Sequence, residues 1–495
     1  MKTNTLDFDA QALRERILDL AMRGKLVPQD PNDEPASVLL EKIKAEKEEL
    51  VKEKKIKKRE ANLPKFDNLS YLPTGWVMTK LKEITTPLSL NDGDWILSKN
   101  MSDKPEVKLI QLGSIGYGKY VNKGFKYITN DTFDELNCTQ IKPGYLLINR
   151  LINKNKLMTT ILPDIDGKLI TAVDICWIAP SKEFNQEFMM YQLMSPKFQR
   201  RVNKLASGST RKRISKGNLI NIPIYLPPLS EQSRIAAKIA QLFALLRKVE
   251  SSTQQYAELQ TLLKSKVLDL AMRGKLVKQD PNDEPASVLL EKIKAEKAEL
   301  VKEKKIKKSK PLSPITDEEK PFDIPDSWEW VRLGAIFDIT SSKRVMKSEW
   351  RNEGVPFYRA REIVSIKNHR ALKDPIFISE ETYKEKAEVS GRPKIDDILL
   401  TGVGTLGVPY VVSDNKEFYF KDGNIIWLRN IGKINSYYIS NYVQSPYMTK
   451  IINNGRGTTV ATLTIVRARN LLVPLPPLME QTRIVNKINK LYKLI

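Results

Sequence analysis

The sequence predicts an α+β protein in which two mixed α/β domains are separated by two antiparallel long-helix, coiled-coil-like conserved regions in a pseudo-twofold circular arrangement. Three observations predict this architecture. A near-identical segment occurs twice, apolar residues between the two domains follow a heptad spacing, and the two ends of the chain together repeat most of one central helix.

The internal repeat organises the chain. Residues 18–58 and 268–308 differ at only two positions, Pro28/Lys278 and Glu48/Ala298. The stretches between these copies resemble each other weakly, although both end in a Leu-Pro-Pro-Leu junction. Near-identical and divergent parts therefore alternate, which indicates a tandem duplication.

The near-identical parts are predicted to be helical. From Ile235 to Leu270, apolar residues recur at the 4-3 spacing of a heptad. We expect Ser230 to cap the start of this helix and Gly274 to end it. A helix of roughly 40 residues would be about 60 Å long. A second helix is expected to begin near Pro285.

The ends of the chain complete the helical pattern. Residues 484–495 repeat the apolar spacing of 235–246, and residues 13–20 repeat that of 263–270. The chain therefore corresponds to a circle opened inside one helix. We expect the two termini to meet and their half-helices to rebuild a copy of the central helix.

The pattern divides the chain into five parts. These are a conserved helical region over 1–60, a first divergent domain over 61–229, a central helical region over 230–310, a second divergent domain over 311–475, and a C-terminal helix over 476–495 that pairs with the N-terminal one. The divergent domains contain strand-like runs such as 145–148, 175–178, 409–412 and 425–428. A helix is expected over 186–205 and again over 434–453.

Composition indicates the kind of partner. The formal net charge is +23, which favours a polyanion, most often nucleic acid, over a protein with merely solvated lysine faces. No apolar run approaches the roughly 20 residues that span a bilayer, so no membrane is expected. Two cysteines cannot form a disulfide framework, and residues 1–7 lack the apolar stretch of a signal peptide, so none is expected. We expect a cytoplasmic protein.

Sequence features that suggest chemistry are weak. Residues 402–407 match G-x-G-x-x-G, but a dinucleotide site needs a helix next, and the following residues favour a strand. Asp164, Asp166 and Lys168 could serve a metal-dependent nuclease, yet they are too close together and favour a turn. The single histidine, His369, is expected at the surface. No metal site and no bound cofactor are predicted.

Two loops at matching places fit DNA contact. Small residues let a backbone approach phosphates, hydroxyl groups donate to them, and arginine can hydrogen-bond guanine in the major groove. An ordinary solvated basic loop is the alternative. The loop candidates are Ser209, Thr210, Arg211, Lys212 and Arg213 in the first domain and Arg456, Thr458 and Thr459 in the second. Weaker candidates are Arg150, Lys154, Lys156, Lys343, Arg344, Arg359, Arg361, Arg392 and the hairpin residue Gly404.

With these features, the chain resembles the specificity subunit of type I restriction-modification enzymes. The resemblance rests on residues 226–235 with 475–484, on the loops 208–210 and 457–459, and on the helical repeats ending at 21–26 and 271–276. It covers essentially the whole chain. It implies two target-recognition domains, each of which reads one half of a split site in double-stranded DNA.

The resemblance also implies partners and a division of labour. The conserved helices would dock two methyltransferase subunits, and restriction (translocase) subunits would join that core. The chain itself would be non-catalytic, whereas the assembled complex would act as a DNA adenine methyltransferase and an ATP-dependent endonuclease. S-adenosylmethionine, ATP and Mg would bind the partner subunits.

Two other function classes compete with this interpretation. A standalone sequence-specific or architectural DNA-binding protein with a coiled-coil spacer would explain the charge and the helices. Co-purification of methyltransferase subunits would favour the specificity-subunit interpretation over this one. An oxidoreductase that uses the glycine loop around Gly404 would need to bind a nucleotide cofactor, which a titration can test.

Overall fold

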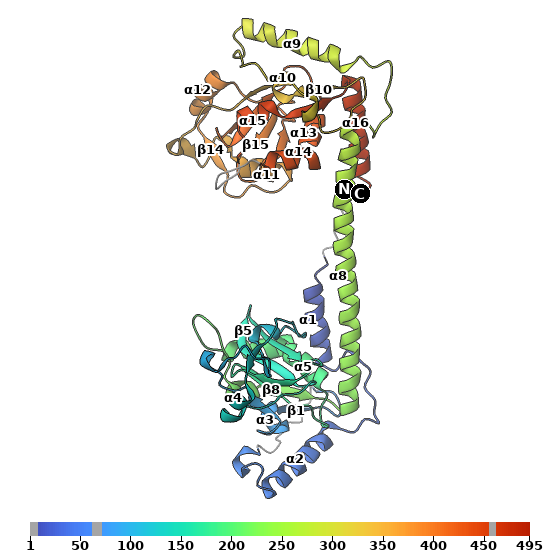
Figure 1. Cartoon of the computed structure of the whole chain (residues 1–495), viewed down its shortest axis with the longest axis vertical. Helices are drawn as coiled ribbons and strands as arrows, with labels where there is room; N and C mark the ends of the chain where they lie inside the picture. The colour runs from blue at the N-terminus through green and yellow to red at the C-terminus, as the bar shows by residue number, and fades with distance from the viewer. Residues whose placement is uncertain (1–7, 62–71, 455–461) are drawn as a thin grey trace. The chain divides into compact units, whose positions relative to one another are not determined.

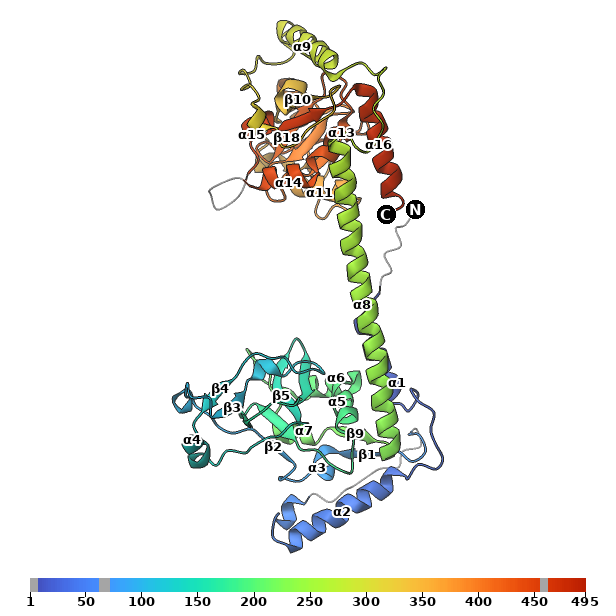
Figure 2. The same ribbon diagram turned by 45° about the vertical axis from the view of Figure 1, so that its right-hand side comes forward.

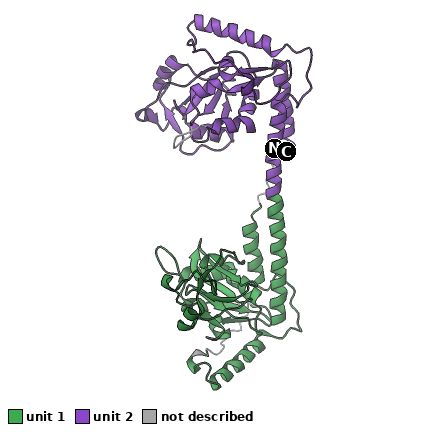
Figure 3. Cartoon of the chain, viewed as in Figure 1, with its two compact units in different colours: residues 1–253 green, residues 254–495 purple. Residues whose placement is uncertain are grey.

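The computed structural model describes residues 8–61, 72–454 and 462–495. Two compact units divide the chain, Met1–Thr253 and Gln254–Ile495 (Figure 3). Each unit combines helices with small, mostly antiparallel sheets. The predicted α+β class is therefore confirmed. None of the helices in the described part combines the length and the apolar character that a membrane span requires.

One long helix contributes to both units. Helix α8 (Leu229–Met272) has 44 residues, as the heptad spacing predicted. Its end is also as predicted, because Gly274 follows it with φ +68°, a left-handed conformation suited to glycine. The predicted cap is wrong. The helix begins before Ser230, whose hydroxyl contacts the carboxylate of Asp33 instead of capping the helix.

Each unit contains the same antiparallel helix pair. In the first unit, α1 (Ala10–Ala21) lies beside the first half of α8, and the Arg14 guanidinium donates to Glu250 at 2.8 Å (Figures 1 and 2). In the second, α16 (Leu478–Tyr492) lies beside the other half, and the Tyr492 hydroxyl donates to the carbonyl of Lys264 at 3.2 Å. Because α1 repeats the sequence of the second half of α8 and α16 repeats the first, both units are built from equivalent pieces. The predicted junction of the chain ends involves residues 1–7, which lie outside the described residues.

A second helix of the repeat docks on each domain through a lysine, which is buried in the first unit and half-buried in the second. In α2 (Ala36–Lys52), the Lys47 ammonium donates to the carbonyl of Glu83 at 2.8 Å, at the end of α3 (Leu81–Ile84). In α9 (Ala286–Lys302), Lys297 donates to the carbonyl of Gly334 at 2.6 Å, within α10 (Leu333–Ile336). Burial lowers the pKa of both lysines to about 8.

The first domain begins and ends in one strand pair. Strand β1 (Val77–Lys80) pairs antiparallel with β9 (Pro223–Leu226). One sheet has the order β2-β8-β5-β6 and another the order β4-β3-β7. The strands of these two sheets are β2 (Leu90–Asp92), β3 (Val107–Ile110), β4 (Lys126–Ile128), β5 (Leu146–Asn153), β6 (Lys156–Ile161), β7 (Lys168–Thr171) and β8 (Ile175–Ile178), and two short helices are α4 (Asn130–Glu135) and α7 (Lys216–Ile220).

The second domain repeats this plan. Strand β10 (Glu329–Arg332) pairs antiparallel with β19 (Leu472–Leu475). Its sheets have the orders β11-β18-β15-β16 and β12-β14-β13-β17. Their strands are β11 (Asp338–Thr340), β12 (Trp350–Arg351), β13 (Val355–Tyr358), β14 (Ile376–Ile378), β15 (Ile398–Thr401), β16 (Pro409–Val411), β17 (Tyr419–Phe420) and β18 (Ile425–Arg429), and the accompanying helices are α11 (Ala360–Lys367), α12 (Glu380–Ser390) and α15 (Ile465–Asn470).

The two helices predicted within the domains are each interrupted at a Ser-Pro step. The first is α5 (Gln186–Met194) followed by α6 (Pro196–Leu205), and the second is α13 (Ser436–Val443) followed by α14 (Pro446–Asn453). Proline lacks an N–H group and forces the preceding residue into an extended conformation, so it starts a new helix.

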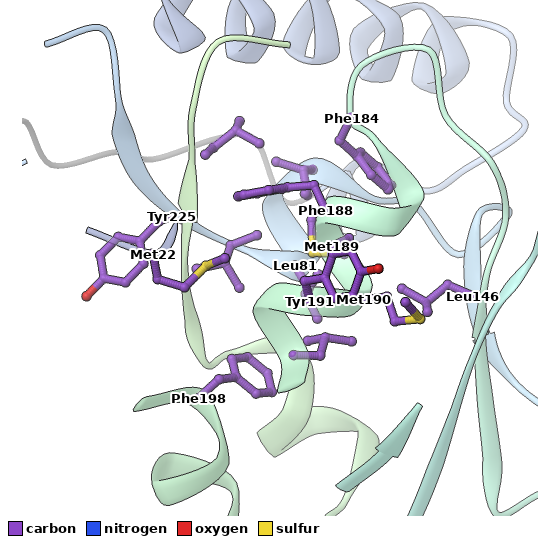
Figure 4. Packing of buried hydrophobic residues seen from close by; sticks show 14 of the residues in the cluster. Met22, Leu81, Leu146, Phe184, Phe188, Met189, Met190, Tyr191, Phe198 and Tyr225 are labelled. Atoms are coloured by element: carbon purple, nitrogen blue, oxygen red, sulfur yellow. The ribbon is translucent and has the colours of Figure 1, made fainter. Parts of the chain in front are cut away.

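Helix α5 forms the centre of the first core. Its residues Phe188, Met189 and Leu193 are fully buried, and Phe188 and Met189 point into the cluster with Leu81 and Leu146 around them (Figure 4). The cluster continues into α1, α2 and the first turns of α8. The domain and the helix pair therefore share one core, which fixes the domain on its helices.

Candidate nucleic-acid interface

Two strands with the same backbone partners lead to the candidate surface. In the first unit, the N–H of Arg150 donates to the Asp174 carbonyl at 2.9 Å, and the Arg150 carbonyl accepts from Ile214 at 3.0 Å. In the second unit, Gly402 donates to the Asn424 carbonyl at 2.8 Å and accepts from the Leu463 N–H at 3.0 Å. Arg150 and Gly402 therefore occupy equivalent positions, and the segments that follow them can be compared directly.

The basic loop of the first unit is a closed hairpin. Ser207 and Arg213 exchange backbone hydrogen bonds of 3.0 and 2.8 Å, and Ile152 in β5 donates to the Lys212 carbonyl at 2.8 Å. Gly208 has φ +114°, and a Cβ there would lie 2.5 Å from the Arg211 carbonyl oxygen, so the turn requires glycine. A tight, glycine-dependent turn thus presents the loop side chains.

These side chains are open to solvent. Ser209, Thr210, Arg211 and Lys212 are all exposed. Within the described residues no ion pair engages Arg211 or Lys212, whereas Arg213 binds Asp174 at 2.9 Å. The loop therefore offers two cations and two hydroxyl groups to a ligand, as sequence reasoning proposed for DNA contact.

The tip of the neighbouring hairpin adds a further cation. Strands β5 and β6 are joined at Lys154 and Asn155, both with positive φ, and Lys154 is exposed. Lys156 is placed differently. Its ammonium lies 4.7 Å from the centre of the Tyr117 ring and 3.6 Å from Glu15 of α1, so it ties the hairpin to the helix.

Arg150 is not available to read DNA, which corrects the sequence-based assignment. Its side chain is 3% exposed and is held by Asp92 at 2.9 Å and by the Val173 carbonyl at 2.6 Å. Burial raises the pKa of Asp92, because desolvation outweighs the attraction of Arg150. The guanidinium thus cross-links the strand to the 172–174 loop and has a structural role.

The glycine loop of the second unit is a hairpin turn. Strand β16 follows it and pairs with β15, so no helix is present to hold a pyrophosphate. The Thr401 hydroxyl bridges the turn by accepting from the Val408 N–H at 2.9 Å and by donating to the Thr405 carbonyl at 2.5 Å. Gly404 has φ +70° with open space around it. The turn matches the β5–β6 hairpin of the first unit.

The other DNA-contact candidates of the second unit differ in whether their side chains are free to bind a ligand. Lys343 and Arg344 are exposed in the segment after β11. Arg456, Thr458 and Thr459 lie outside the described residues. Three arginines are already engaged by carboxylates: Arg359 and Arg361 bind Glu362 at 2.7 and 2.6 Å, and Arg392 binds Glu417 at 2.8 Å. Arg359 is the least available of these, because its side chain is only 19% exposed.

Sequence reasoning did not single out Trp95, which lies beyond β2 and is 68% exposed. A tryptophan followed by the apolar residues Ile96 and Leu97 carries no sequence signal of exposure, since tryptophan is usually buried.

The structure offers little for other chemistries. Among the described residues, no cluster of three or more histidine, cysteine or acidic side chains could hold a metal ion. His369 is exposed, as expected, and Asp164 and Asp166 are exposed too. Cys138 and Cys176 are both unpaired and buried, and burial raises the pKa of their thiols.

Comparison with known proteins agrees with this picture. A family model described as "Type I restriction modification DNA specificity domain" matches residues 73–260 and 325–495. The chain is 32% identical to the EcoAI type I restriction enzyme specificity subunit of Escherichia coli, over 98% of this chain and 89% of the relative. It is 29% identical to the EcoEI specificity subunit of the same organism, with the same coverage.

A solved structure shares the fold. It is described as the structural basis of complex assembly and conformational transition of the type I R-M system. One of its chains matches this chain with a TM-score of 0.55 at 20% sequence identity, and the match covers 85% of this chain and 91% of the other.

Proposed function

The chain belongs to the type I restriction-modification DNA specificity family, and we propose that it recognises a bipartite target in double-stranded DNA, with one half-site for each unit. Specificity subunits of this family are the chain's relatives over nearly its whole length. The alternative of a standalone or architectural DNA-binding protein is favoured by no observation.

One observation carries the proposal. Arg150 and Gly402 have matching backbone partners, so in each domain the hairpin that follows this position lies beside the segment that begins at Ile214 or Leu463. The side chains on these elements differ between the units, whereas the contacts that support the domains are the same. A shared scaffold with different surface groups suits the recognition of two different base sequences.

The exposed loop of the first unit has the chemistry of a duplex contact. Arg211 can donate two hydrogen bonds to guanine, and Ser209 and Thr210 can donate to phosphate oxygens. The net charge of +23 adds sequence-independent attraction to DNA. We assign base reading to Arg211 and backbone contact to its neighbours.

The repeated helices suit identical partners. The helical repeat is nearly identical in the two units, including its exposed lysines, whereas the domains differ. We propose that these helices dock two methyltransferase subunits and that restriction (translocase) subunits join the assembly in the cytoplasm. Adenine methylation and ATP-dependent cleavage, with S-adenosylmethionine, ATP and Mg, belong in this scheme to the partners, while this chain is non-catalytic.

Co-expression tests the proposal. The full chain is produced with a candidate methyltransferase subunit from the same genome, the complex is purified, and methylated adenines are mapped across the host genome. We expect co-elution and a methylated motif with two specified halves separated by unspecified bases. A chain that elutes alone and binds DNA by itself, or a methylated motif without a gap, would contradict it.

A further inference from the structure

An exposed indole marks a position on the first domain. All seven tryptophans of the chain lie within the described residues, and Trp95 is the only exposed one, with 68% of its surface accessible. An indole has a large apolar surface, and leaving it in water costs free energy that burial would recover. An isolated exposed tryptophan therefore suggests a contact with a partner.

The backbone that carries Trp95 is firmly held on both sides. The N–H of Asp94 donates to the Thr171 carbonyl at 2.8 Å, and the Asp94 carboxylate accepts from the Thr139 N–H at 3.0 Å. On the other side, Ile96 packs against the core of the β4-β3-β7 sheet. The ring is thus presented by an anchored segment, which suits a recognition element more than a fraying loop.

The same position in the second domain carries an arginine. Leu90 in β2 pairs with Ile178, and Ile339 in β11 pairs with Leu428. These partners are equivalent, because Ile178 pairs with Leu146 of β5 and Leu428 with Ile398 of β15. Counting equally far beyond Leu90 and Ile339 leads to Trp95 and Arg344.

Arg344 is likewise exposed and unengaged. It lies in the segment between β11 and the short helix before β12, and no residue in the described ranges forms an ion pair with its guanidinium. Two exposed side chains of different chemistry therefore stand at one equivalent position of the two domains.

The position borders the candidate interface in both units. In the first, Asp94 bridges to Ala172, and the same 172–174 loop contacts Arg150 and, through Asp174, Arg213 of the basic loop. In the second, the Ser341 hydroxyl donates to the Ile425 carbonyl at 2.9 Å, next to Asn424, which accepts from Gly402. Through these contacts the 95/344 segment is linked to Arg150 and the basic loop in the first domain and to Gly402, where the glycine hairpin begins, in the second.

We infer that the 95/344 position determines base specificity in both domains. Trp95 makes an apolar contact with the C5-methyl group of a thymine in the half-site read by the first domain. Arg344 donates to O6 and N7 of a guanine in the other half-site. Thymine methyl groups and guanine acceptors are features of the major groove that apolar side chains and arginine read, respectively.

The inference rests on the proposed function and is tested in the same complex. The wild-type chain, W95A, W95F and R344A are each co-expressed with the methyltransferase subunit, and methylated sites are mapped. We expect W95A to relax one thymine of the first half-site and R344A to relax one guanine of the second, each on the order of tenfold. The conservative variant W95F should keep the wild-type motif, and L136A, which alters another exposed apolar residue of the first domain, serves as the control.

Modified DNA tests the contacts themselves. Replacing that thymine by deoxyuridine removes only the methyl group, and we expect weaker binding by wild type but no further loss by W95A. Replacing the guanine by 7-deazaguanine removes N7 and should weaken wild type but not R344A. If W95A and R344A methylate the same motif as the wild type, the inference is wrong. In that case a wild-type motif with two separated halves still supports the proposed function. Failure of the wild type itself to give a split motif would instead contradict the proposed function.

Discussion

The indole Nε1 of Trp76 donates to the buried carboxylate of Glu231 at 2.9 Å. Trp328 and Glu480 make the same contact at the same distance in the second unit. The contact joins the entry of each domain to the first turn of the helix that leaves it. Burial raises the pKa of both carboxyl groups, so each depends on its few donors.

Replacing Trp76 by phenylalanine should weaken this joint. Buried Glu231 loses a donor, and the smaller phenyl ring leaves a cavity where the indole packed, so we expect a loss of about 2–4 kcal/mol in the free energy of unfolding. Hydrogen exchange should speed up in the first unit, whereas W328F should do the same in the second. W95F, which alters an exposed ring, is the control. Equal exchange in W76F and W95F would contradict the role assigned to the contact.

Replacing Lys47 by methionine should loosen α2 from the first domain. The variant keeps the chain length but loses the donor to the carbonyls of Lys82 and Glu83. We expect faster hydrogen exchange in α2 and α3 and, near pH 10.5, where the charge no longer has to be buried, a loss of about 1–3 kcal/mol in the free energy of unfolding from the unsatisfied carbonyls. K44M, at an exposed position of the same helix, should leave exchange unchanged. Protection equal to wild type in K47M would rule out this docking contact.

Because of Lys47, the free energy of unfolding is expected to depend on pH. Its pKa is about 8 in the folded chain, below the ordinary value of 10.5. Below pH 8, Lys47 is charged in both the folded and the unfolded chain, so burying its charge lowers the free energy of unfolding by the full amount. Between about 8 and 10.5 the folded state binds fewer protons, so this contribution to stability rises with pH. The stability difference between wild type and K47M, measured by urea unfolding, should therefore grow across this window, and a flat difference would contradict the assignment.

Two arginines of the first domain should behave in opposite ways. R150A leaves Asp92 without its nearest cation, and we expect it to cost about 3 kcal/mol of stability. R211A removes an exposed, unengaged side chain, so stability should change by less than about 0.5 kcal/mol. Binding to the first half-site should weaken in R211A. Equal loss on unrelated DNA would show that Arg211 contacts phosphate rather than a base.

The helices were predictable because their signals are local and repeated. The spacing from Ile235 to Leu270 predicted α8, and Gly274 predicted its end. The break at Pro196 was not predicted, although a proline inside a helical pattern marks a boundary. Periodicity reports which face of a helix is buried, so the long helices followed from it.

The site was less predictable because charge does not reveal burial. Arg150 is an arginine in a strand, and only its contact with Asp92, far away in the sequence, shows that it is structural. Trp95 is the opposite case, an apolar residue that the fold leaves exposed. Both assignments needed the tertiary structure, because each depends on which segments the sheets bring together.

The strand pairs at the entrance of each domain allow the most direct test of half-site reading. Val77 pairs with Leu226, and Glu329 pairs with Leu475, so each domain begins and ends at adjacent strands. Residues 77–226 can therefore be inserted in place of 329–475. Adenine methylation by this chimera, in complex with the methyltransferase subunit, should map to a motif whose two halves are the same sequence in inverted orientation. A folded, active chimera that still methylates the wild-type motif would contradict the assignment of one half-site to each domain.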